Sequence, residues 1–329
     1  MEWNILGHEW AAKLLQQHIA RGETRHAYLF TGPSGVGRRS LALKFAQALN
    51  CTQPPAPGQP CGTCRACQQI GRMQHTDLSV VQAETVGGTL KVDQVRELQH
   101  TLSLAPYEAR YRVALLLRFE EAHVSAQNAL LKTLEEAPEK VILLLTADSA
   151  ENLLPTIVSR CEVLRLRPMG VAQLQSELAA RWQIEPEAAQ RLAHLSGGRV
   201  GAALNLRAEP ESLDLRREWV EDALRLAQAS RRERFSYAES VKTKEREWLR
   251  QMLLVWLSLW RDVLMRAAGA DTPLVNLDWQ ADIEQLAGRV SLPAARAVTA
   301  ALEQNLARLD ANLNRQLLLE VTLLDWPRA

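Results

Sequence analysis

The chain has 329 residues, enough for two or three domains that each bury a core. Its composition, with 47% hydrophobic and 23% charged residues, is that of a soluble globular protein. A formal net charge of +1 argues against a strongly basic overall surface for autonomous DNA binding but allows a local basic patch. The opening MEWNILGHEW lacks the pattern of a secretory signal, and the longest apolar run, Met252–Trp260, is far shorter than the ~20 residues of a membrane span. We therefore expect a cytoplasmic protein with no membrane segment.

The first part of the chain has the pattern of a helix, a strand, a glycine-rich turn and a second helix. Residues 1–27 predict the short helical lead-in, and the apolar run Tyr28–Phe30 predicts the strand. After the turn, Leu41, Phe45 and Leu49 recur at helical spacing. This order is typical of a phosphate-binding loop, because backbone N–H groups at a helix N-terminus can surround an anion.

The loop keeps the glycines of the template G-x-x-x-x-G-K-[ST] but changes its two functional side chains. Arg38 replaces the Lys that reaches the phosphates, and Arg39 replaces the hydroxyl residue that holds Mg²⁺. Ser40 comes one residue late, roughly 100° round the helix, so we expect its hydroxyl to miss the metal. The candidate nucleotide-loop residues are Gly32, Gly35, Gly37, Arg38, Arg39 and Ser40.

Four of the five cysteines form a cluster with the spacing C-x₉-C-x₂-C-x₂-C, namely Cys51, Cys61, Cys64 and Cys67. In a cytosolic chain such a cluster indicates a metal site rather than disulfides, and four thiolates favour a closed, structural Zn²⁺ site. An iron–sulfur cluster is an alternative, although residues 68–71 lack the next cysteine of the ferredoxin pattern. Unliganded thiols are the third interpretation. The Pro/Gly-rich spacer suits a surface knuckle.

Strands alternating with helices follow the cysteines. Apolar runs predict strands at 78–81, 112–119 and 141–146, and helical periodicity predicts helices at 92–102 and 126–134. This alternation indicates an α/β domain with a parallel sheet. Ligands of such sheets bind at the carboxyl ends of the strands, where the glycine loop also falls.

Two acidic residues, Glu120 and Glu121, follow the run RVALLLRF. In ATPases of this architecture an Asp at the first position supports Mg²⁺ and a Glu at the second polarises the attacking water. The extra methylene of Glu120 matters because Mg²⁺ demands near-ideal geometry, whereas Glu121 has the type and place of a base. The alternative is that both acids simply belong to a solvated strand end.

The chain beyond residue 166 has a helical pattern without a convincing strand. Helices are expected at 171–182, 186–195 and 200–206, followed by a polar boundary near 209–212. Two later apolar stripes predict helices that pack in a core or contact another subunit, and they consist of Leu249, Leu253, Trp256, Trp260 and Leu264, then Leu302, Leu306, Leu309, Leu313 and Leu317.

Five segments in this order resemble clamp-loader subunits of bacterial DNA polymerase III: HAYLFTGPSGVGRRSLA, the four-cysteine knuckle, FEEAHVSAQNALLKTLEEAP, LLPTIVSRCEVLRLRP and NLNRQLLLEVTLL. The resemblance covers nearly the whole chain. It implies an AAA+ nucleotide-binding-like α/β domain at 1–166 with a zinc module at 51–67, a small helical lid at 167–209, and an all-α collar that oligomerises at 210–329. The implied partners are gamma/tau and delta subunits and, through the complex, the sliding clamp and primed DNA.

The family contains active ATPases, gamma/tau, and an ATPase-deficient type, delta'. Arg38, Arg39 and Glu120 depart from the active pattern, and the family's sensor-2 arginine aligns with Gly201, near Arg199. These departures favour the ATPase-deficient type, with ATP or ADP binding doubtful. The alternatives are a gamma/tau-type ATPase with a variant phosphate loop, and nucleotide binding without turnover.

The resemblance also implies a role for the segment Ser159-Arg160-Cys161. In it, Arg160 would be an arginine finger that acts in trans on a nucleotide of a neighbouring subunit. Without the family, Arg160 would be interpreted as a solvated charge. Thr146 lies near the sensor-1 position, where its role is doubtful without hydrolysis in cis. A nucleic-acid role for the zinc knuckle is disfavoured, because it carries too few cations.

Overall fold

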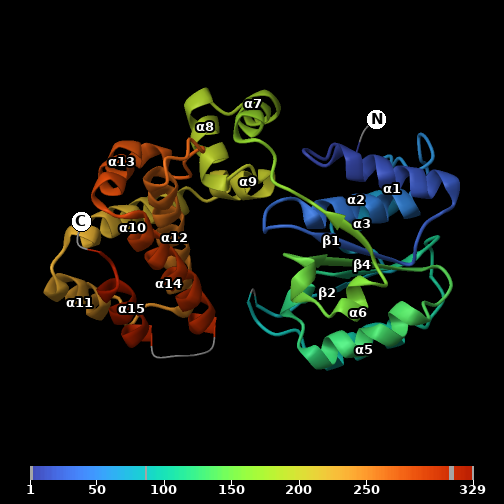
Figure 1. Ribbon diagram of the computed structural model, residues 1–329. Coiled ribbons are helices and arrows are strands. Elements are labelled where there is room, and N and C mark those ends of the chain that lie inside the picture. Colours follow the sequence, from blue (N-terminus) through green and yellow to red (C-terminus); the bar gives the residue numbers. More distant parts are fainter. Residues whose placement is uncertain (1–2, 86, 311–314, 328–329) are drawn as a thin grey trace. The chain divides into compact units, whose positions relative to one another are not determined.

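The computed structural model describes residues 3–85, 87–310 and 315–327 (Figure 1). Leu313 of the second expected stripe lies outside the described residues, as does the beginning of the last family segment. Contacts between residues divide the chain into two compact units. The first holds residues up to 169 together with 199–202, and the second holds 170–198 and the residues from 203 onward. The division into three domains stays a prediction.

The first unit is built on a five-stranded parallel sheet with the order β2-β3-β4-β1-β5. Every residue of β1, β3 and β4 is buried, as expected for apolar strands covered on both faces. The strand β5 was not predicted; it is a short edge strand in which two apolar residues lie between two charged ones. The strands are β1 Ala27–Thr31, β2 Leu78–Val81, β3 Arg112–Leu116, β4 Val141–Ala147 and β5 Glu162–Arg165.

Helices cover both faces of this sheet, with two separate apolar cores between them (Figure 1). One core contains side chains of α1, α2 and α3, and the other contains those of α4, α5 and α6. The α/β class predicted for this part of the chain is thereby confirmed. The helices are α1 Glu9–Arg21, α2 Arg38–Asn50, α3 Arg65–Gly71, α4 Val92–Leu102, α5 Val124–Glu135 and α6 Pro155–Val158.

The third strand ends earlier than the apolar run predicts. We expected a strand to Phe119, but β3 ends at Leu116 and the chain turns through Arg118, whose φ is 49°. A short 3₁₀ helix, η1 Phe119–Glu121, follows, and a second one, η2 Ala150–Asn152, follows β4. The turn buries Phe119 in the core, which explains why the apolar pattern continues past the strand.

The second unit is entirely helical in its described residues, as predicted for the part beyond residue 166. Its core contains Trp256 and Trp260 of α12, whose rings pack edge-on against Trp326 at centroid distances of 5.0 and 5.2 Å. The helices are α7 Val171–Trp182, α8 Pro186–Ser196, α9 Val200–Ala208, α10 Pro210–Gln228, α11 Arg231–Ser240, α12 Arg246–Ala267, η3 Leu277–Trp279, α13 Gln280–Arg289, α14 Leu292–Asp310 and α15 Arg315–Leu324.

None of the helices in the described part of the chain is long and apolar enough to span a lipid bilayer. The helices of the second unit instead bury their apolar faces against one another. The first expected stripe, from Leu249 to Trp260, lies in this core, so core packing accounts for these residues.

A buried carboxylate organises the segment that leads into β3. The side chain of Asp77 accepts hydrogen bonds from the backbone N–H groups of Tyr107, Glu108 and Ala109 at 2.7 to 2.9 Å. It also pairs with Nη2 of Arg112 at 3.1 Å. Burial raises the pKa of Asp77, but the three N–H groups and Arg112 together outweigh burial and hold this pKa below its usual value. Asp77 is therefore charged at neutral pH.

We predict that Asp77→Asn lowers the free energy of unfolding by about 3 kcal/mol at pH 7, because it leaves the buried Arg112 without its counter-charge. The native pKa of Asp77 lies below its unfolded value of about 4, so the contribution is complete above pH 4 and declines as the pH falls through the native pKa. Urea unfolding at pH 7 and at lower pH measures the difference. The control is Asp93→Asn, at an exposed ion pair, and an equal effect of both variants would contradict the prediction.

Candidate functional site

The glycine-rich loop lies between β1 and α2, as predicted. The N–H of Gly32 donates to the carbonyl oxygens of Ala147 and Asp148 at the end of β4. A Cβ on Gly32 would come within 2.4 Å of the carbonyl oxygen of Leu166, so the close approach requires glycine here. Gly37 is the N-cap of α2, with a φ of 114°. The backbone of the loop thus has the tight turn that its glycines predict.

The beginning of α9 lies directly against this loop. The N–H of Gly201 donates to the carbonyl oxygen of Gly35 at 2.8 Å, and Nη1 of Arg199 donates to that of Ser34 at 3.1 Å. A Cβ on Gly35 would lie 2.8 Å from the backbone nitrogen of Ala202, and a Cβ on Gly201 would lie 2.8 Å from the carbonyl oxygen of Gly35. Two glycines therefore allow the chain to pack closely against Gly35 of its own glycine-rich loop.

Arg38 faces the acidic residue that follows β3. Its Nη1 lies 3.8 Å from Oε1 of Glu120, and only 9% and 17% of the two side chains are exposed. Burial lowers the pKa of Arg38 and raises that of Glu120, and the attraction between the two charges opposes both shifts. Arg39 and Ser40 are exposed to solvent. The loop thus brings a buried cation to the acid at which an active ATPase would hold Mg²⁺.

The other two candidate nucleotide-site residues, Glu121 and Thr146, stabilise the turn after β3. Oε1 of Glu121 accepts hydrogen bonds from the N–H of Gly87 and from Nε of Arg118, both at 2.9 Å. Oγ1 of Thr146 accepts one from the N–H of Arg118, also at 2.9 Å. The sequence analysis missed Arg118, because nothing in an apolar run signals a left-handed turn at an arginine.

These residues do not fit a Mg²⁺-nucleotide. A donor set for that group needs a lysine on the phosphates, a hydroxyl on the metal and an open loop. Here the loop carries Arg38 in an ion pair with Glu120, and Ala202 packs against Gly35. Nη1 of Arg38 and Oε2 of Glu120 are both buried without a hydrogen-bond partner in the described structure, so the pair is imperfectly matched.

The four clustered cysteines meet in space, and their sulfur atoms all lie within 4.8 Å of one another. A tetrahedral ion with Zn–S bonds of about 2.3 Å places its sulfurs about 3.8 Å apart, and the Sγ atoms of Cys51 and Cys64 are 4.0 Å apart. The backbone N–H groups of Cys61, Cys64 and Cys67 each donate to the sulfur of another member of the cluster. This donor set could hold a metal ion.

The cysteine module is attached to the first helices. The carbonyl oxygen of Gly58 accepts a hydrogen bond from Nε1 of Trp3 at 2.9 Å, and a Cβ on Gly58 would meet the backbone of Gln16 in α1. On the other side, Nε2 of Gln47 in α2 donates to the carbonyl oxygen of Cys67. A metal ion in the module would therefore also hold the end of the long spacer against α1.

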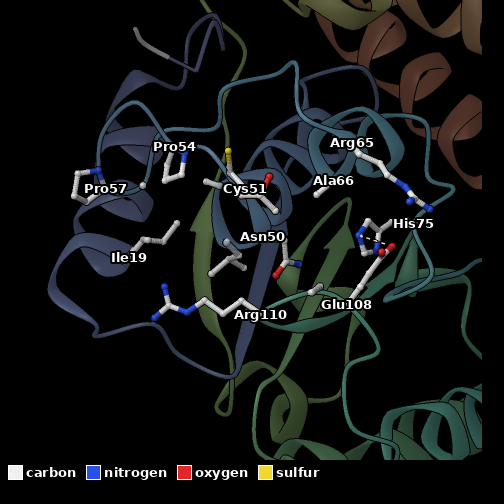
Figure 2. A pocket seen from close by; sticks show the side chains of 15 residues that line it. Ile19, Asn50, Cys51, Pro54, Pro57, Arg65, Ala66, His75, Glu108 and Arg110 are labelled. Atoms are coloured by element: carbon white, nitrogen blue, oxygen red, sulfur yellow. Dashed lines mark ion pairs between the residues drawn. The ribbon is translucent and has the colours of Figure 1, made fainter.

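A pocket of 430 Å³ lies beside this module (Figure 2). The module contributes Cys51, Pro54 and Pro57 to its lining. Elsewhere in the lining, Nε2 of His75 and Oε1 of Glu108 form an ion pair at 3.7 Å. Because one of the sulfur ligands borders the pocket, loss of a metal ion would change the shape of this surface.

Arg160 follows α6 and is partly exposed. Its Nη2 donates to Oε1 of Glu135 at 2.6 Å, and its Nη1 donates to the carbonyl oxygen of Thr156 at 2.8 Å. The adjacent Cys161 packs against the core of α4 to α6, and burial raises its pKa to about 12. The sequence analysis named Arg160 but missed Glu135, which lies 25 positions earlier and carries no signal of this contact.

A curated relative spans almost the whole chain. The DNA polymerase III subunit delta' of Pseudomonas aeruginosa is 32% identical over 322 residues, which are 96% of this chain and 96% of that one. The chain belongs to the delta' family. The delta' subunit of Bacillus subtilis is 28% identical over 94% of this chain and 92% of its own length. Family models described as "DNA polymerase III, delta subunit" and its C-terminal part match residues 7–170 and 210–328.

Tau subunits of DNA polymerase III match a shorter part of the chain. That of Escherichia coli is 35% identical over 211 residues, which are 62% of this chain but only 32% of the tau subunit. The similarity to delta' thus extends over the C-terminal helices, whereas that to tau does not cover the whole chain. In addition to the sequence motifs, the structure of this chain shows that Gly201 packs against Gly35 of the loop and that Arg38 pairs with Glu120.

We predict that Cys64→Ser, or treatment of the wild-type chain with a chelator, lowers the thermal unfolding temperature by at least about 5 °C. The physical reason is that a bound ion stabilises only the folded module, which in turn contacts α1 and α2. Differential scanning calorimetry measures the shift. Cys161→Ser is the control for the loss of a thiol outside the cluster. Because Cys161 packs against the apolar core, this variant should keep the wild-type response to the chelator, whereas Cys64→Ser should lose it. The same response to the chelator in both variants would contradict a metal-bound module.

Proposed function

We propose that this chain is the delta' subunit of a DNA polymerase III clamp loader, a cytoplasmic assembly that places the sliding clamp on primed DNA. In this proposal the chain does not hydrolyse ATP itself. It assembles with gamma/tau and delta subunits and supplies Arg160 to a nucleotide bound by a neighbouring ATPase subunit. The observation that carries the proposal is the similarity to delta' subunits over 96% of both chains.

The absence of hydrolysis in cis is supported by the packing of the loop and by its charges. Gly201 and Ala202 pack against Gly35, so another segment of the chain lies beside the loop whose backbone N–H groups a phosphate would need. Nη1 of Arg38 lies 3.8 Å from Oε1 of Glu120, so a positive charge opposes the binding of a divalent cation at this acid. Both obstacles would have to be removed before the chain could bind Mg²⁺ and ATP together.

A role for Arg160 in trans is supported by its exposure and its chemistry. A guanidinium stabilises the charge on a transferring phosphoryl group, and in the best-studied GTPases this is worth about 10³–10⁵ in rate. About a third of the side chain, 34%, is accessible, so a neighbouring subunit can reach it. Arg38 could not serve in this way because it is buried.

A gamma/tau-type ATPase is the second candidate function, because the tau subunit of Escherichia coli is 35% identical over 62% of the chain. The packing and the charges of the loop count against it. So does the extent of the match, since delta' relatives continue through the C-terminal helices.

We also propose that the ion of the four-cysteine module is Zn²⁺ in a structural role. Four thiolates close a tetrahedral site and leave no open position for catalysis. Elemental analysis of the purified chain should find about one zinc per chain and no stoichiometric iron, whose clusters also absorb visible light.

We predict that the purified chain hydrolyses no ATP above background, with or without primed DNA, and that neither ATP nor ADP raises its unfolding temperature. The physical reason is that Arg38 stands in the place of the phosphate-binding lysine and pairs with Glu120, while Gly201 packs against Gly35 of the loop. A coupled ATPase assay and thermal shift measure these two properties, with a gamma/tau subunit of the same organism as the positive control. Sustained turnover by the chain alone would favour the gamma/tau-type function.

We further predict that Arg160→Ala abolishes turnover at one ATP site of the reconstituted complex and so lowers its DNA-dependent ATPase rate. Assembly should be unaffected, because the side chain is partly exposed and outside the cores. Steady-state ATPase assays and size-exclusion chromatography measure the two properties. Arg167→Ala, at an exposed arginine nearby, provides the matched control. An unchanged rate with Arg160→Ala would exclude the finger.

A further inference from the structure

The side chain of Arg160 is held by two acceptors from different helices. Glu135, the last residue of α5, accepts from Nη2 at 2.6 Å, and the carbonyl oxygen of Thr156 in α6 accepts from Nη1 at 2.8 Å. We propose that Glu135 is a positioning residue, which holds the guanidinium of Arg160 in one orientation for an anionic group on a neighbouring chain. This inference rests on the proposed role of Arg160 in trans.

The backbone around this pair is fixed by buried contacts. Leu134, next to Glu135, and Ile157, next to Thr156, are fully or almost fully buried in the same apolar core. Oε1 of Gln127 in α5 accepts a hydrogen bond from the N–H of Leu154, immediately before α6, at 3.0 Å. The end of α5 and the segment after α6 therefore have a defined separation, and the remaining freedom lies in the two side chains.

The pair leaves enough of the guanidinium available for a ligand. An arginine side chain carries five N–H donors, and the hydrogen bonds to Thr156 and Glu135 use one on each terminal nitrogen. Three donors remain, and two suffice for bidentate binding of a phosphate. Glu135 can thus orient Arg160 without competing for every donor that the phosphate would need.

A gain in stability is not what this pair provides. The side chains of Arg160 and Glu135 are 34% and 50% exposed, and ion pairs this open to water contribute little to folding. A long arginine at a surface instead loses several rotamers when it binds. Holding the guanidinium in place beforehand reduces that loss at the moment when the neighbouring nucleotide reacts.

The test uses the reconstituted complex of this chain with its gamma/tau and delta partners, primed DNA and clamp, with ATP varied to separate kcat from KM. Glu135→Ala should reduce the part of kcat that Arg160→Ala removes about 3–10-fold, at unchanged KM for ATP, because the orientation matters in the transition state. Glu135→Gln, which keeps an acceptor oxygen, should restore part of the loss. Glu136→Ala removes the neighbouring exposed carboxylate and should behave as wild type.

A further variant tests whether Glu135 acts through Arg160. The double variant Glu135→Ala/Arg160→Ala should match Arg160→Ala alone, which supports the inference. A loss with Arg160→Ala and no loss with Glu135→Ala would overturn the positioning role and leave the proposed finger intact. A higher kcat with Glu135→Ala would also overturn the positioning role, because it would mean that Glu135 holds Arg160 away from the neighbouring nucleotide. No effect of Arg160→Ala would overturn both proposals.

Discussion

The parallel pairing of β1 with β4 and β5 is the constraint on which the candidate site depends. All five residues of β1 are buried, and its carboxyl end leads directly into the glycine-rich loop. Since the strands run in one direction, the turn with Glu120 after β3 and the end of β4 with Thr146 reach the same edge of the sheet. The N–H of Leu166, after β5, returns to the carbonyl oxygen of Thr31 and completes this edge.

At that edge, shape and charge act in the same direction. The absence of side chains at Gly35 and Gly201 allows two backbone segments to touch, and the N–H of Gly201 donates to the carbonyl oxygen of Gly35 in the loop. Arg38 places a positive charge in a largely buried position. There the carboxylate of Glu120 offsets the free-energy cost of removing the guanidinium from water. The glycine-rich loop is thus part of the packing of its own domain.

Two ion pairs of the first unit illustrate how burial determines what an arginine can do. Arg38 and Glu120 are buried together, so neither charge can reach a ligand outside the chain. Arg160 and Glu135 are partly exposed and pair through a single hydrogen bond, so the guanidinium keeps donors for another molecule. The same chemical pair is therefore structural at the phosphate loop and suited to recognition at the surface.

Much of this organisation could be predicted from the sequence, because burial on both faces and helical periodicity are local patterns. They identified β1, β3 and β4, the all-helical C-terminal part, and the cysteine spacing that the fold turns into one cluster. Local patterns could not identify the edge strand β5, which has only two apolar residues between two charged ones, or the left-handed turn at Arg118. Nor could they show that Gly201 packs against Gly35 or that Glu135 holds Arg160. Such contacts join residues far apart in the chain, and only the packing of whole helices on the sheet decides which of them meet.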